Sequence, residues 1–131
     1  MTEFRLNPDG PHSDDYTRHV AQAFAESVRV LNYATRTSDG MPEPATLNSV
    51  LGDLRTGMHR MDQLLRQVRQ RLSDFGQGDL VDSRERDVDE VVGWARVSIA
   101  EALDRASSCA AHLDRAFNDT SGLYLRDGGD G

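Results

Sequence analysis

The most constraining feature of this sequence is a seam of large apolar residues between positions 47 and 75. Successive members are alternately four and three residues apart, without an exception. The members are Leu47, Leu51, Leu54, Met58, Met61, Leu65, Val68, Leu72 and Phe75. This spacing is typical of a helix that packs lengthwise against another helix. The seam therefore predicts a long helix whose apolar side needs a partner along much of its length.

Two loops rich in turn-forming residues bound this helix, at residues 37–44 and 76–83. Pro44, with Glu43 before it, suits the first turn of the helix, and Gly76 suits its C′ position. The length would then be roughly 48 Å at ~1.5 Å per residue. An earlier helix is expected from Ser13, a good N-cap, to about Arg36.

A third helix is expected to start at Asp82, because Asp82 and Glu85 have the spacing of a capping box. It should end near Gly122. A seam with the same four-three spacing runs along it and is rich in alanine, which lets a partner helix approach closely. Cys109 belongs to this seam and is expected to behave as a small core residue. Alternating apolar and polar residues never persist, so no strand is expected.

The expected fold is all-α, an antiparallel three-helix bundle with long, coiled-coil-like helices over residues 13–122. Residues 1–12 would form an N-terminal arm and residues 123–131 a flexible tail. The first helix, roughly 36 Å long, cannot cover the whole pair formed by the other two. We therefore expect a second copy of the chain to cover the remainder as a homodimer, although the loops or the arm could do so instead. The candidate interface comprises Leu51, Leu54, Met58, Met61, Leu65, Val68 and Leu72.

The charges give two competing interpretations of the second helix. Its basic stripe, formed by Arg55, His59, Arg66 and Arg69, could follow the phosphates of a nucleic acid. However, the formal net charge of the chain is −7, which disfavours nucleic acid and anionic membranes. The arginines near the end of the second helix would also face acidic residues at the start of the third in an antiparallel pair. We expect these charges to neutralise each other, and we therefore do not expect a nucleic acid as partner.

Catalytic and metal sites find little support in the sequence. Cys109 and His112 share a helix face, but further ligands for a metal are not evident. Arg105 and His112 are formally similar to the loose motif of HEPN-type ribonucleases. Asp87 with Glu90, and Glu101 with Asp104, look like the paired carboxylates of MazG-type pyrophosphohydrolases. Because all four acids fall on one predicted helix, they cannot converge on one magnesium ion within a chain.

Three stretches carry a resemblance: SVRVLNYATR (27–36), VLGDLRTGMHRMDQLLRQV (50–68) and NDTSGLYLR (118–126). They resemble small all-helical actinobacterial proteins of uncharacterised function, some of them encoded near mobile-element or regulatory genes. The resemblance touches all three predicted helices and implies a cytoplasmic, all-helical protein. It brings no catalytic or cofactor-binding residues with it.

These observations lead us to expect a non-enzymatic helical interaction or adaptor protein that forms a homodimer and presents a helical surface to an unidentified protein partner. The alternatives are a nucleic-acid-associated regulator that uses the basic stripe, and a small hydrolase of the MazG or HEPN type. No cofactor and no metal are expected. No apolar run is long enough to span a membrane, and the N-terminus lacks the apolar core of a signal peptide, so a cytoplasmic location is expected.

Overall fold

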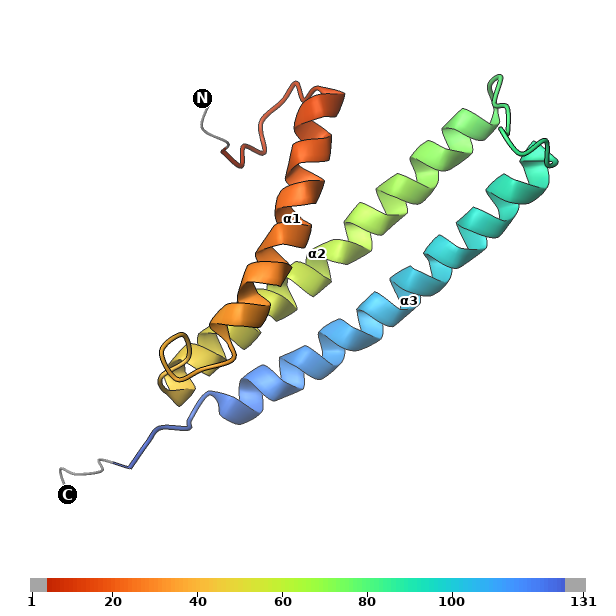
Figure 1. Ribbon diagram of the computed structural model, residues 1–131. Coiled ribbons are helices and arrows are strands. Elements are labelled where there is room, and N and C mark those ends of the chain that lie inside the picture. Colours follow the sequence, from red (N-terminus) through yellow and green to blue (C-terminus); the bar gives the residue numbers. More distant parts are fainter. Residues whose placement is uncertain (1–4, 127–131) are drawn as a thin grey trace. The chain divides into compact units, whose positions relative to one another are not determined.

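The computed structural model describes residues 5–126, which contain three helices and no strand. The helices are α1 (Asp14–Ala34), α2 (Pro44–Gly76) and α3 (Val88–Thr120), as Figure 1 shows. The all-helical prediction is confirmed. The chain divides into two compact units, and the boundary between them lies between Glu43 and Pro44. In the part of the chain described, no helix is long and apolar enough to cross a membrane.

The N-terminal unit consists of α1 and the arm that precedes it. Ser13 caps the helix as expected, because its hydroxyl oxygen accepts a hydrogen bond from the Tyr16 N–H at 3.1 Å. The Tyr16 hydroxyl also accepts from the Asn7 N–H at 2.7 Å and donates to the Arg5 carbonyl. The His12 ring stacks on the Tyr16 ring at 5.4 Å. These contacts hold residues 5–12 against the first turn of α1.

The second helix begins at Pro44, as predicted, and its last helical residue is Gly76. Proline is tolerated there because the N–H group that it lacks would have no partner within the helix. The helix contains 33 residues, which corresponds to about 50 Å. Its length therefore agrees with the extent of the apolar seam.

The third helix starts later than predicted. Its N-cap is Asp87, whose carboxylate accepts from the Glu90 N–H at 3.1 Å. Asp82 lies in the loop instead, where it accepts from the backbone N–H of Arg86 at 3.0 Å and pairs with the Arg86 guanidinium at 2.9 Å. The capping-box prediction at Asp82 and Glu85 was therefore wrong. The same Asp-x-x-Glu spacing recurs five residues further on, at the observed start of the helix.

The second and third helices pack side by side and run in opposite directions (Figure 1). Asn48, early in α2, donates to the Phe117 carbonyl late in α3 at 2.9 Å. Arg69, late in α2, donates through Nε to the Arg96 carbonyl at 3.1 Å. We call this pair the hairpin, and the end that carries the 77–87 loop its distal end. Residues 121–126 follow α3 without helical structure, and the rest of the expected flexible tail lies outside the described residues.

Small residues let the two helices of the hairpin approach closely. A Cβ atom added at Gly52 would lie 2.9 Å from the Phe117 ring, so only glycine fits there without a shift. Ala106 and Ala110 are the only described residues of the chain that are buried. No large side chain in the described part is fully enclosed. The two helices of the hairpin therefore approach each other closely and bury few side chains between them.

Candidate interaction surface

The apolar seam of α2 divides into two rows with different exposure. Both rows repeat every seventh residue, so the members of each row lie on nearly the same side of the helix. The inner row is half-buried and comprises Leu51, Met58, Leu65 and Leu72. The outer row comprises Leu47, Leu54, Met61, Val68 and Phe75, and all but the half-buried Met61 are exposed. The candidate interface residues predicted from the sequence are therefore distributed between a row next to α3 and a row directed outward.

The third helix contributes small residues to the same side of the hairpin. Ile99 of α3 lines the same shallow hollow as Val68 and Phe75 of the outer row. Ala102 is three residues after Ile99 and so shares its face, and Cys109 follows one heptad later. Both Ala102 and Cys109 are exposed, so the prediction that Cys109 is a core residue was wrong. The outer row and these small side chains together form one open, apolar side of the hairpin.

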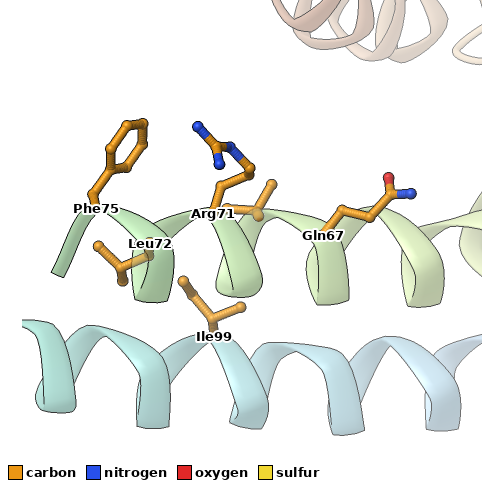
Figure 2. Close-up of a pocket in the computed structure, with 6 residues that line it drawn as sticks. Gln67, Arg71, Leu72, Phe75 and Ile99 are labelled. Carbon is orange, nitrogen blue, oxygen red and sulfur yellow. The ribbon is translucent and has the colours of Figure 1, made fainter. Parts of the chain in front are cut away.

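The open side is hollowed near the distal end into a shallow groove of about 400 Å³. We call it the distal groove, and its lining comprises Gln67, Val68, Arg71, Leu72, Phe75 and Ile99. Figure 2 shows Ile99 directed toward α2, whereas Arg71 and Phe75 rise away from α3. The Arg71 guanidinium lies 4.9 Å from the centre of the Phe75 ring and 2.8 Å from the Asp74 carboxylate. The groove is therefore apolar at its floor, with an arginine on its rim.

A polar cluster joins the two helices away from the distal groove. Asp114 of α3 receives hydrogen bonds from His59 at 2.9 Å and from Arg55 at 3.1 Å, both on α2. The hydrogen bond from His59, followed by that from Arg55, holds the pKa of Asp114 below its usual range. The Arg55 guanidinium also lies over the Phe117 ring, 4.5 Å from its centre. This cluster fixes the register of the helices at that position.

The basic stripe does not form a row of unpaired cations. Arg55 and His59 both contact Asp114. Arg66 pairs with Asp62 one turn earlier at 2.9 Å, and Arg69 reaches the backbone of α3. The structure thus places the predicted stripe on α2, but each of its members already has a partner within the chain.

The predicted neutralisation between the end of α2 and the start of α3 was wrong. Arg66 and Arg71 pair within their own helix, and Asp82 pairs with Arg86 in the loop. Four acids in the first half of α3 form no ion pair within residues 5–126. They are Asp89, Glu90, Glu101 and Asp104. The first half of α3 therefore carries carboxylates that are open to an external partner.

The residues considered for catalysis and metal binding do not form a cluster. Arg105 and His112 are exposed on α3, and the His112 ring contacts Arg115 at 2.6 Å. Within the described ranges, no three His, Cys, Asp or Glu side chains are grouped so that they could hold a metal ion. Asp87 serves as the helix cap, with Glu90 in the first turn. The geometry thus provides an apolar surface as its most developed feature.

Comparison with protein-family models, with curated proteins and with solved structures finds no significant match to this chain. The evidence for a function is therefore the open apolar side of the hairpin.

Proposed function

We propose that this chain is a non-enzymatic helical interaction protein that forms a homodimer and presents a helical surface to a protein partner in the cytoplasm. The observation that carries the proposal is the outer row of α2. Leu54, Val68 and Phe75 are 40%, 47% and 54% exposed along one side of a long helix. Isolated exposed apolar residues are ordinary, but a contiguous apolar stripe is typical of an interaction surface.

In this proposal α1 packs on the open side as the third helix of an antiparallel, coiled-coil-like bundle. Its apolar residues include Val20, Phe24, Val28 and Leu31, and residues 5–43 of its own unit contain no other helix on which they could pack. However, α1 has 21 residues and the hairpin helices have 33 each. At ~1.5 Å per residue, α1 spans about two thirds of the hairpin. The remaining third is available to a second copy or to another protein.

The alternative of a nucleic-acid-associated regulator has less support, because the members of the basic stripe are paired within the chain. The hydrolase alternatives have less support because their motif residues lie apart on one helix. An interaction surface requires neither free cations nor converging acids.

Light scattering coupled to size-exclusion chromatography tests the proposal over a range of protein concentrations. We expect a dimer for the parent and a helical monomer when Leu54 and Val68 are both changed to Asp, because an unpaired carboxylate is unfavourable in an apolar contact. Gln63→Asp is the matched control, since Gln63 is an exposed polar residue of the same helix. A parent that is monomeric at every concentration would refute the homodimer.

A further inference from the structure

The proposed homodimer leaves open which part of the apolar side binds the second copy, and the inference that follows rests on that proposal. Nine residues connect Ala34 to Pro44, and in the proposed bundle α1 folds back from this connection onto the hairpin. A helix that folds back from this connection covers the open side from the Pro44 end. With 21 residues, it would end about one turn before Val68 and about three turns before Phe75. In the proposed bundle, the distal groove is therefore the part of the open side that α1 would leave uncovered.

The charges on the distal half of the hairpin indicate what binds in the distal groove. Residues 60–76 of α2 carry four arginines and two aspartates, so this segment is net positive. Asp87, the N-cap of α3, and residues 88–104 of α3 together carry five acids and one arginine, so that segment is net negative. Pairing like segments of two copies would bring like charges together, which is unfavourable. Pairing α2 of one copy with α3 of the other brings opposite charges together.

We infer that the distal groove binds the distal half of a second copy, with α2 of each copy lying against α3 of the other around a two-fold axis parallel to the helices. Such an axis makes the contact isologous, which means that both copies use the same surface. The distal groove of each copy is therefore covered by the distal half of the other copy. The distal ends then form a short, antiparallel four-helix bundle. Its packing is the arrangement that heptad-spaced apolar rows favour.

The register of the hairpin predicts which side chains meet. Arg69 contacts the backbone of Arg96, and a Cβ atom at Gly76 would lie 3.4 Å from Val92. A two-fold axis parallel to the helices preserves these heights. Phe75 of one copy therefore lies near the height of Trp94 in the other.

Both of these aromatic side chains are more than half exposed in the single chain. Aromatic residues are frequent anchors of protein interfaces, and offset or edge-to-face ring pairs are favourable. A standard interface buries ~800 Å² per partner. Phe75, Trp94 and Val68 would supply its apolar centre, with polar side chains at the rim.

The same register predicts one ion pair between copies. Arg71 of one copy lies near the height of residues 95–96 in the other, and Glu101 is less than two turns further along that helix. Two long side chains can span this separation. Both Arg71 and Glu101 are exposed, and Glu101 has no ion-pair partner in the described chain. Arg71 of each copy is therefore expected to contact Glu101 of the second copy.

The test compares substitutions in the distal and proximal parts of the same outer row. Phe75→Gln should yield a folded monomer, whereas Leu54→Gln should remain dimeric. Independently of these, Arg71→Glu should raise the dimer dissociation constant on the order of tenfold, because like charges then face each other. Adding Glu101→Arg to Arg71→Glu should restore dimerisation close to that of the parent. Analytical ultracentrifugation under reducing conditions measures all four variants, and circular dichroism checks their helicity.

The outcomes separate this inference from the proposal on which it rests. A monomeric parent would overturn both. A dimeric parent that stays dimeric with Phe75→Gln and with Arg71→Glu would overturn the distal interface and leave the homodimer standing. If Phe75→Gln unfolds the chain, the Arg71→Glu variant and its combination with Glu101→Arg test the interface instead, because Arg71 and Glu101 are both exposed. A double variant that is no better than Arg71→Glu alone would then overturn the inference.

Discussion

At the residue scale, Asp114 is the main polar connection between α2 and α3. One carboxylate receives hydrogen bonds from both His59 and Arg55, and the first of these contributes most to its lowered pKa. A pKa that is lower in the folded state than in the unfolded chain stabilises the fold above the unfolded value, which is ~3.9 for aspartate. This contribution is lost as the pH falls through the lower, folded value. Asp114 should therefore support the hairpin at neutral pH and cease to do so in acid.

We expect Asp114→Asn to lower the melting temperature at neutral pH, because the neutral amide interacts less strongly with Arg55 and His59 than the carboxylate does. The difference from the parent should persist down to about pH 4 and then shrink, as the parent carboxylate becomes protonated. Thermal melts followed by circular dichroism between about pH 7 and pH 2 measure this difference. Asp53→Asn is the control, since Asp53 is exposed and forms no ion pair in the described chain. A constant difference across the whole range would contradict the assignment.

At the scale of the elements, the sequence predicted the helices because their apolar spacing is local information. The start of α3 was missed because Asp82 and Asp87 are both followed by glutamate at the capping-box distance. Only the folded loop distinguishes them, where Arg86 pairs with Asp82 and leaves Asp87 to cap the helix.

The position of the interaction surface was only partly predictable, for a similar reason. Heptad spacing identifies the seam, but which row of the seam faces α3 depends on the direction in which the hairpin closes. Exposure of Phe75 and half-burial of Leu72 follow from that closure. The charges were misassigned because Arg66 and Arg71 have acidic neighbours within one helical turn. Such pairs form within one helix and therefore do not depend on the position of a second helix.

The close approach of the helices gives a prediction for two glycines of α2. Gly57 has no atom within 4 Å of an added Cβ, so Gly57→Ala should raise the free energy of unfolding by ~0.5–1 kcal/mol through helix propensity. Gly52→Ala gains the same propensity but places its Cβ 2.9 Å from the Phe117 ring, which also supports Arg55. We expect this variant to be no more stable than the parent. Urea unfolding measures both, and equal stabilisation would show that the helices do not approach closely at Gly52.

At the scale of the whole molecule, the question is whether the basic stripe of α2 has a function of its own. The chain carries a net charge of −7, and an average surface of this sign repels the phosphate backbone. A local row of arginines could still overcome this repulsion if its cations were free. In the structure, Arg66 is paired with Asp62, and Arg69 is engaged with the α3 backbone. Binding phosphates would require breaking these contacts first.

We therefore expect binding to an arbitrary DNA duplex at physiological salt to be in the weak, non-specific range, with a dissociation constant of ~10⁻⁴ M or weaker. Fluorescence anisotropy with a labelled duplex measures this binding over a series of salt concentrations. Changing Arg66 and Arg69 together to Ala should leave this weak binding unchanged. If these arginines contacted phosphates, the double substitution would weaken the binding and reduce its salt dependence. Arg18→Ala is the control, because Arg18 is an exposed arginine of the N-terminal unit. Submicromolar binding that the double substitution weakens would make the basic stripe the functional surface, and the apolar side would then need another explanation.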